Sequence, residues 1–188
     1  WKFCREDDVF SVLGENKTGM KLSCMADVGR CNFARDICEK ASSPFDMYRI
    51  ATYINTIPAA VEMIEYCEKM GYETTVNIMA ISRETEKEIS LALEMLGKSP
   101  VRAIYIVDSY GSVYPEEMRV IAEKYLEAGA KYGKEIGTHA PTNQNLAFAN
   151  TIQCTAMGRN FLDATVERMG RAPAKRAPRL RAAFLTPP

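Results

Sequence analysis

The sequence predicts an α/β protein in which parallel strands alternate with helices. Short β-rich runs recur along the chain, and segments with helical spacing of apolar residues separate most of them. The runs start at residues 20, 47, 74, 103, 135 and 161, so successive starts lie 27, 27, 29, 32 and 26 residues apart. This is the period of one strand, one helix and two short loops, which is typical of repeated βαβ units.

Six strands are predicted from these runs. The fourth is apolar until its last residue, Asp108, as expected for a parallel strand that is covered on both faces. The predicted strands are residues 20–27, 47–53, 74–82, 103–108, 135–139 and 161–166.

Helices are predicted between most of the strands. Pro58 stands at a favourable first-turn position, with Val61, Ile64 and Cys67 on the inner face and Gly71 as a stop. Further helices are predicted around residues 89–96, from residue 115 onward and after residue 139, and residues 31–43 are read as a short helix and a loop. The predicted helix around residues 89–96 has the i, i+3, i+4, i+7 apolar stripe of an amphipathic helix. Its members are Ile89, Ala92, Leu93 and Leu96.

The charge balance excludes some classes of partner. The chain has 188 residues, and 24 Lys and Arg balance 24 Asp and Glu. Zero net charge argues against nucleic acid or an anionic membrane as a partner, and no apolar run reaches the roughly 18 residues of a bilayer span. Residues 1–8 do not read as a targeting peptide, so we expect a cytoplasmic protein. Residues 1–167 are the expected domain, and 168–188 a basic, Pro-containing tail that is solvated.

The cysteines and the single histidine do not form a recognisable metal-binding pattern. No Cys-x-x-Cys pair occurs, and His139 is the only histidine. A structural zinc site needs about four closely placed ligands, so we expect reduced and mostly buried thiols instead. The cysteines are Cys4, Cys24, Cys31, Cys38, Cys67 and Cys154.

Polar residues recur where the predicted strands end. In a parallel barrel this face carries the active site, but an open doubly wound sheet also binds ligands there, so the pattern alone does not choose between the folds. Gly-x-Gly-x-x-Gly and Walker-type loops are missing from the sequence, which weighs against a phosphate-binding barrel or a Rossmann-like domain. The strand-end residues are Asp27, Thr52, Asn55, Asn77, Asp108, Ser109, His139, Asp163 and Thr165.

Two of these strand ends are candidate functional segments. Asp108 could order a cation, a water or a neighbouring arginine, and Ser109 could donate to a substrate carboxylate. Alternatively, Asp108 only caps its loop and Ser109 fills a turn. His139 is either a functional group at the same face or a hydrogen-bonded structural residue.

Several motifs in order resemble the metal-dependent aldolase and acyltransferase (HMG-CoA lyase-like) superfamily, most of all its 4-hydroxy-2-oxovalerate aldolase-like branch. The resemblance extends from near residue 1 to about Arg171. The matching stretches are residues 77–82, 106–111 with 114–116, 137–139 with 146–150, and 162–165 with 169–171.

The resemblance implies a partial (β/α)8 TIM barrel with about six βα units. These would be strands 3 to 8 of the family barrel, with the N-terminal strands outside this sequence. Two open sheet edges would then remain, so we expect the chain to dimerise, to aggregate or to be only marginally stable. A homo-oligomer is therefore a possible state.

The resemblance also implies one divalent cation, Mn²⁺, Mg²⁺ or Zn²⁺, that polarises the carbonyl of a 2-oxo acid. His139 matches the first histidine of the family's metal-binding pair. The second falls on Pro141, which cannot ligate, and the family's asparagine ligand falls on Lys175. We therefore expect weak or absent metal binding by this chain.

Two functions from different classes follow. The first is a carbon–carbon lyase or aldolase that acts on a small 2-oxo acid through pyruvate-type enolate chemistry, impaired in this chain. Its implied catalytic residues are Asp108 and Ser109, and its implied substrate contacts are Ser109 and Asn77. The second is a non-catalytic, degenerate or truncated barrel that serves as a binding or assembly subunit.

Overall fold

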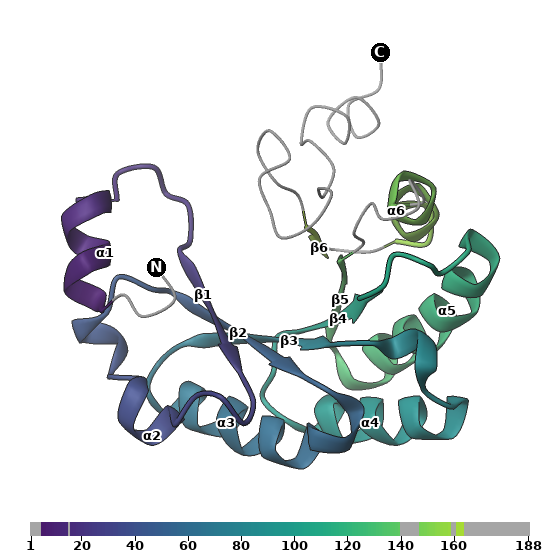
Figure 1. The fold of residues 1–188 in the computed structure, drawn as a ribbon, viewed down its shortest axis with the longest axis horizontal. Helices are drawn as coiled ribbons and strands as arrows, with labels where there is room; N and C mark the ends of the chain where they lie inside the picture. The colour runs from purple at the N-terminus through teal and green to yellow at the C-terminus, as the bar shows by residue number, and fades with distance from the viewer. Residues whose placement is uncertain (1–4, 15, 140–146, 159–160, 164–188) are drawn as a thin grey trace.

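The computed structural model describes residues 5–14, 16–139, 147–158 and 161–163. These residues form one six-stranded sheet in the sequential order β1 to β6, with every neighbouring pair parallel (Figure 1). The predicted α/β class and all six predicted strand positions are thus confirmed. The strands are β1 (Ser23–Asp27), β2 (Met47–Thr52), β3 (Glu73–Ile78), β4 (Ala103–Val107), β5 (Glu135–His139) and β6 (Phe161–Leu162).

The sheet is curved, and helices α3, α4 and α5 lie along its convex side (Figure 1). Short 3-10 turns η1 (Lys40–Ser42), η2 (Ile54–Thr56) and η3 (Ile81–Arg83) occur in the loops. The helices are α1 (Glu6–Leu13), α2 (Phe33–Asp36), α3 (Ile57–Lys69), α4 (Glu86–Lys98), α5 (Pro115–Tyr132) and α6 (Ala147–Ala156).

Local sequence explains where the long helices begin and end. Pro58 lies in the first turn of α3, where a missing N–H has no cost. Thr85 caps α4, since its hydroxyl accepts the N–H of Glu88 while its own N–H donates to the Glu88 carboxylate at 2.9 Å. Gly133 ends α5 in the left-handed region at φ 66°, a conformation that glycine adopts without strain.

Some boundaries differ from the predicted ones. β1 begins at Ser23 rather than at residue 20, and β3 ends at Ile78 rather than at residue 82. The chain leaves β3 because Ala80 adopts a left-handed φ of 57° and η3 follows. Helix α1 was not expected, and none of its residues is buried. Residues 164–166 of the predicted sixth strand and the tail 168–188 lie outside the described residues.

The two faces of the sheet carry different side chains. The convex face packs an apolar core against the helices, with Ile50, Val76 and Ile104 fully buried. On the concave face Tyr105 is buried in a smaller cluster with Ala103, Val107 and Phe161. The concave face corresponds to the interior of a barrel, and barrel enzymes have their active sites where this interior meets the carboxyl ends of the strands.

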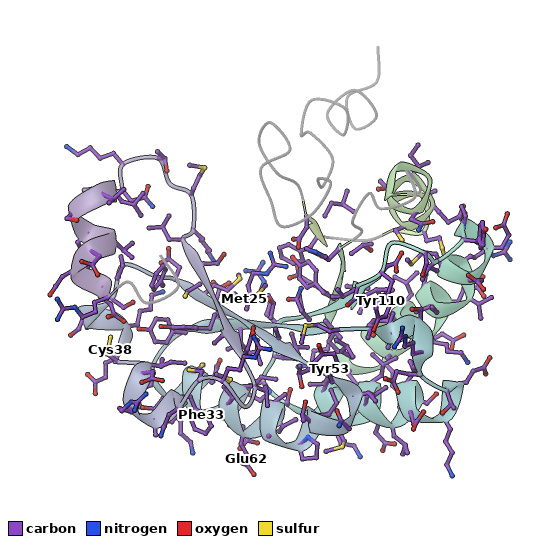
Figure 2. The ribbon with its side chains drawn as sticks, viewed as in Figure 1. Met25, Phe33, Cys38, Tyr53, Glu62 and Tyr110 are labelled. Atoms are coloured by element: carbon purple, nitrogen blue, oxygen red, sulfur yellow. The ribbon has the colours of Figure 1, made fainter. Side chains whose placement is uncertain are left out.

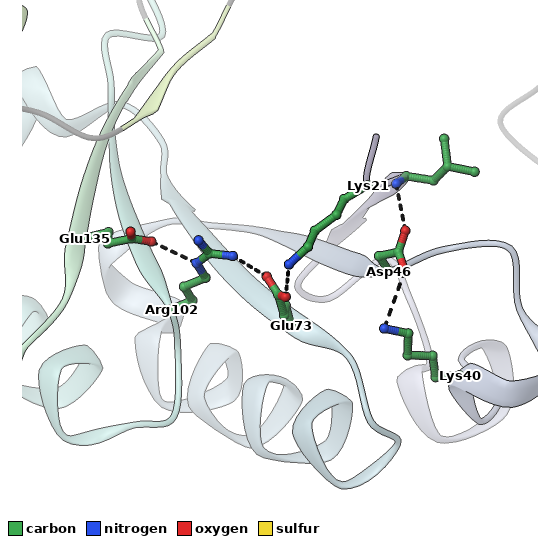
Figure 3. Close-up of polar contacts among 7 residues, drawn as sticks. Lys21, Lys40, Asp46, Glu73, Arg102 and Glu135 are labelled. Atoms are coloured by element: carbon green, nitrogen blue, oxygen red, sulfur yellow. Dashed lines mark hydrogen bonds and ion pairs between the residues drawn. The ribbon is translucent and has the colours of Figure 1, made fainter. Parts of the chain in front are cut away.

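A network of charged side chains lies at the amino ends of the strands (Figure 3). Arg102 bridges the carboxylates of Glu73 on β3 and Glu135 on β5, and Lys21 pairs with Glu73 as well. Asp46 accepts the backbone N–H of Leu22 at 3.0 Å, which ties the entrance of β1 to that of β2. This end of the sheet is therefore braced by ion pairs. Among the described helices, none is long and apolar enough to cross a membrane.

Candidate active site

Three charged or polar side chains meet on the concave face near the carboxyl ends of the strands. The guanidinium of Arg49 on β2 donates through Nη2 to the Asp163 carboxylate at 2.8 Å. Asp163 follows β6 directly, and its Oδ2 atom also lies 2.6 Å from Nδ1 of His139, the last residue of β5. One carboxylate oxygen thus joins an arginine and a histidine from two other strands.

Neighbouring side chains make room for this cluster. The guanidinium carbon of Arg49 lies 4.6 Å above the centre of the Tyr105 ring, a cation–π geometry. A Cβ atom at position 137 would stand 2.5 Å from that ring, so Gly137 is the residue that allows Tyr105 to lie there. Only a glycine on β5 permits this arrangement of Arg49 over Tyr105.

Burial and hydrogen bonding set the charges of the cluster. Burial alone would raise the pKa of Asp163, but the hydrogen bonds from His139 and Arg49 outweigh it and lower the pKa to about 2. For Arg49, burial opposes the charged form, yet the Asp163 contacts prevail and the pKa is raised. Asp163 is therefore ionised at neutral pH, and an ionised carboxylate can only accept hydrogen bonds.

This charge state determines the role of each nitrogen of His139. Because the Asp163 oxygen is an acceptor, Nδ1 of His139 must carry the hydrogen of their 2.6 Å contact. In the neutral ring, Nε2 is then the atom with a lone pair, able to accept a proton or to bind a cation. The His139 side chain is 17% exposed, so the ring is partly accessible.

Asp108 is engaged by its own loop. Its side chain is buried, and its carboxylate accepts the backbone N–H groups of Gly111 at 2.9 Å, Ser112 at 3.3 Å and Val113 at 3.2 Å. The predicted alternative, a carboxylate that caps the loop after β4, matches these contacts. A catalytic role for Asp108 stays a prediction.

Asn77 lies near the carboxyl end of β3, and Ser109 stands in the turn after the neighbouring strand β4. Ser109 is exposed, and its hydroxyl oxygen accepts the N–H of Ala80 at 2.8 Å, which joins the loops after β3 and β4 and leaves the hydroxyl hydrogen to donate elsewhere. Asn77 is buried, and its Oδ1 atom has no hydrogen-bond partner among the described residues. Ser109 thus keeps an exposed hydroxyl that could contact a ligand, whereas the free Asn77 oxygen is buried and its contact with a substrate stays a prediction.

Exposed aromatic side chains surround this edge. Tyr53 follows β2 and Tyr110 follows β4, as labelled in Figure 2, and they are 52% and 41% exposed. The guanidinium of Arg83 lies 4.2 Å from the centre of the Tyr110 ring. The carboxyl edge of the sheet thus exposes rings and polar groups together.

The described donor set does not fit a divalent cation. Within the residues that the structure places, no three His, Cys, Asp or Glu side chains are close enough together to hold a metal ion. His139 offers Nε2, but the adjacent Asp163 is already bound to Arg49, whose positive charge opposes a second cation. Pro141 and Lys175, which stand at two ligand positions implied by the resemblance, lie outside the described residues.

Sequence reasoning missed Arg49 and the link between Asp163 and His139. A signal for Arg49 is present, because it is the one charged residue in the strand run at 47–53. Arg49 shares one face of the strand with Met47 and Ala51, but the sequence does not say that this face is the interior. Asp163 was predicted only as a strand-end residue.

The fold and the strand-end cluster define a parallel α/β barrel-type protein with a candidate site at the carboxyl edge of its sheet. Comparison with known proteins then gives its relatives. No protein family model matches the chain.

Two curated enzymes are similar in sequence. The 4-hydroxy-2-oxovalerate aldolase of Geobacillus stearothermophilus is 26% identical over 136 residues, which are 72% of this chain and 39% of that enzyme. The oxaloacetate decarboxylase of Mycobacterium tuberculosis is 27% identical over 133 residues, 70% of this chain and 38% of that enzyme. The chain thus spans about two fifths of the length of the curated relatives that it matches.

A solved structure shows the same fold. The N-terminal domain of a proposed aldolase from Bacteroides vulgatus superposes with a TM-score of 0.76 and 24% identity, covering 94% of this chain and 58% of that one. The fold is a partial TIM barrel, as predicted, and the chain is similar in sequence to the aldolase-like enzymes that its motifs indicated.

Proposed function

We propose that this chain forms part of a carbon–carbon lyase or aldolase that acts on a small 2-oxo acid. The observation that carries the proposal is His139, which stands at the carboxyl end of β5 with Nδ1 engaged by Asp163. A single nitrogen, Nε2, is left to act at the edge where barrel enzymes bind their substrates. The names of the curated relatives, an oxovalerate aldolase and an oxaloacetate decarboxylase, support a 2-oxo acid as the substrate.

Such reactions develop negative charge on the ketone oxygen, which a cation or fixed hydrogen-bond donors must stabilise. In the family, a divalent metal ion would supply a Lewis acid. Because the described donors do not fit such an ion, we propose that this chain binds it weakly or not at all. Activity in this chain would then be impaired.

The substrate contacts are proposed from exposure and free polar atoms. Ser109 is exposed beside the end of β4 and can donate its hydroxyl hydrogen to a substrate carboxylate. Asn77 has an unpartnered Oδ1 among the described residues and can accept from a substrate hydroxyl. Asp108 is proposed as the second catalytic residue beside Ser109, with its carboxylate also holding the loop after β4.

The second function is a non-catalytic barrel that serves as a binding or assembly subunit. The Arg49 guanidinium favours this second function. It is bound to the Asp163 carboxylate beside His139, so its positive charge disfavours a metal cation next to that histidine. Association through the outer edges of β1 and β6, which end the described sheet, stays a prediction. A cytoplasmic location is also a prediction.

Exchange of the pyruvate methyl hydrogens for deuterium separates the two functions. The full chain is incubated with pyruvate and Mn²⁺ in heavy water, and the methyl signal is followed by proton NMR. Exchange above the metal-only rate that disappears in His139→Ala supports the lyase, whose enolate takes up deuterium. Exchange no faster than the metal-only rate contradicts it and favours the non-catalytic subunit. Arg119→Met, a variant at an exposed pair on α5, is the control.

A further inference from the structure

We infer that Arg49 and Asp163 are positioning residues: Arg49 holds the Asp163 carboxylate in place, and Asp163 fixes the His139 ring with the hydrogen on Nδ1 and the lone pair on Nε2. The inference deepens the proposed function and rests on it only for the use that is made of Nε2. The orientation of the ring follows from contacts among described residues alone.

The backbone places Asp163 beside His139. Asp163 follows the short strand β6, and its N–H donates to the carbonyl oxygen of Thr138 on β5 at 3.2 Å. Thr138 precedes His139 directly, so this backbone hydrogen bond brings the Asp163 side chain within reach of the His139 ring.

Arg49 holds the carboxylate from the other side of the concave face. Its strand, β2, is separated from β6 by β3, β4 and β5. The guanidinium reaches Asp163 by lying over the Tyr105 ring, and both ends of the ion pair are largely buried, with side chains 20% and 12% exposed. A carboxylate this buried needs a cation to stay charged, and the arginine is that cation.

The shared oxygen couples the two contacts. Nη2 of Arg49 and Nδ1 of His139 both lie on Oδ2 of Asp163, at 2.8 Å and 2.6 Å. If the carboxylate rotates, both hydrogen bonds are lost together. Without them, the contact that fixes the His139 ring is lost, the hydrogen can sit on either nitrogen, and Nε2 is no longer a defined acceptor.

Nitrogen-15 NMR of the histidine ring tests this directly, because His139 is the only histidine and gives one unambiguous set of signals. The full chain is measured without metal or substrate, at a pH where the ring is neutral. The expected result for the natural sequence is one form with the hydrogen on Nδ1. In Asp163→Ala this form should give way to the mixture of a free histidine side chain. A ring with its hydrogen on Nε2 in the natural sequence would overturn the inference.

Arg49→Met tests whether Arg49 holds the Asp163 carboxylate in place, and Arg102→Met is its matched control. Arg102 is also an arginine that bridges two strands, and its guanidinium carbon lies 5.4 Å from the centre of the Phe161 ring on β6, so it controls for a general effect on that strand. Among the described contacts it touches neither Asp163 nor His139. We expect the Nδ1–H share to fall in Arg49→Met, to recover in Arg49→Lys and to stay unchanged in Arg102→Met. An unchanged share in Arg49→Met would overturn the role of Arg49.

A double variant separates a specific effect from general loosening. If Arg49 acts through Asp163, then Arg49→Met should add no further change once Asp163→Ala is present. An additional change in the double variant would contradict that route. Since these measurements use no substrate, failure of the lyase proposal and failure of this inference give different results: absent deuterium exchange in the first case, an unfixed ring in the second.

Discussion

Arg49 and Asp163 are 114 positions apart in the sequence, yet their side chains lie 2.8 Å apart across the concave face of the sheet. The contact joins β2 to the residue after β6 and adds to the hydrogen bonds between neighbouring strands. It shows that the sheet is curved enough for one long side chain to cross its interior. The same contact brings a positive charge to the candidate active site.

Removing one member of this ion pair should destabilise the fold. Arg49→Met leaves a largely buried carboxylate without its cation, so the free energy of unfolding should fall by about 3 kcal/mol. Urea unfolding of the full chain measures this. Arg119→Met removes an exposed i,i+4 pair on α5 and should cost about 0.5 kcal/mol or less. Equal losses in both variants would contradict a structural role for the interior pair.

Gly137→Ala should be destabilising through steric overlap. The added Cβ would lie 2.5 Å from the Tyr105 ring, so the ring must move, with a cost of about 1–3 kcal/mol. The variant should also weaken the cation–π contact of Arg49. The double variant Gly137→Ala with Tyr105→Val should regain part of the lost stability in thermal unfolding. No recovery would point to a strain elsewhere.

Asp108→Asn distinguishes a structural from a catalytic carboxylate. The three backbone N–H groups of residues 111–113 would lose a charged acceptor, and the free energy of unfolding should decrease by about 1–3 kcal/mol. Hydrogen exchange of these amides should become faster. If the amides stay protected and stability is unchanged while the deuterium exchange of pyruvate is lost, Asp108 acts on the substrate instead.

Stability should also depend on pH through Glu73. Hydrogen bonds from Lys21, against the opposing effect of burial, and from Arg102 hold the pKa of Glu73 below its usual value of 4.5. Because the pKa of Glu73 is lower in the folded than in the unfolded protein, its ionised carboxylate stabilises the fold at a pH above the unfolded-state pKa. This contribution is lost as the pH falls below about 4.5 and approaches the pKa of the folded state. Urea midpoints of the natural chain and Glu73→Gln should therefore differ at pH 7 and converge in acid. A constant difference would contradict the ion pairing.

Metal binding should be weak. Calorimetric titration of the full chain with Mn²⁺ should give no binding tighter than about the micromolar range, because open catalytic sites use about three protein ligands. The described residues bring no such group together. Binding at micromolar or lower concentration that vanishes in His139→Ala would contradict this prediction.

The regular elements could be predicted because their signals are local. Strand runs alternate with helical stripes at intervals of 26 to 32 residues, and all six strands and the helices α3, α4 and α5 follow that pattern. Helix α1 carries little signal, since it buries none of its residues. The end of β3 depends on the left-handed conformation of Ala80, which an alanine does not announce.

The candidate site could be predicted only in part. His139, Asp108 and Ser109 were found because each stands at a strand end. Their contacts could not be found: Asp108 turns toward its own loop, and His139 is held by a residue that the next βα unit contributes. The partner of that residue, Arg49, comes from a distant strand, and such pairings depend on sheet curvature rather than on sequence spacing.

The network of Lys21, Glu73, Arg102 and Glu135 stabilises the amino ends of the strands, at the opposite end of the sheet from the candidate site. The amino ends of β3, β4 and β5 are held by ion pairs, whereas the carboxyl ends carry the candidate site. New chemistry could therefore be introduced at exposed positions such as Ser109 without disturbing the ion pairs, while Asp108 has to stay because it holds its loop. The same separation predicts that substitutions could abolish the candidate site while the fold is retained.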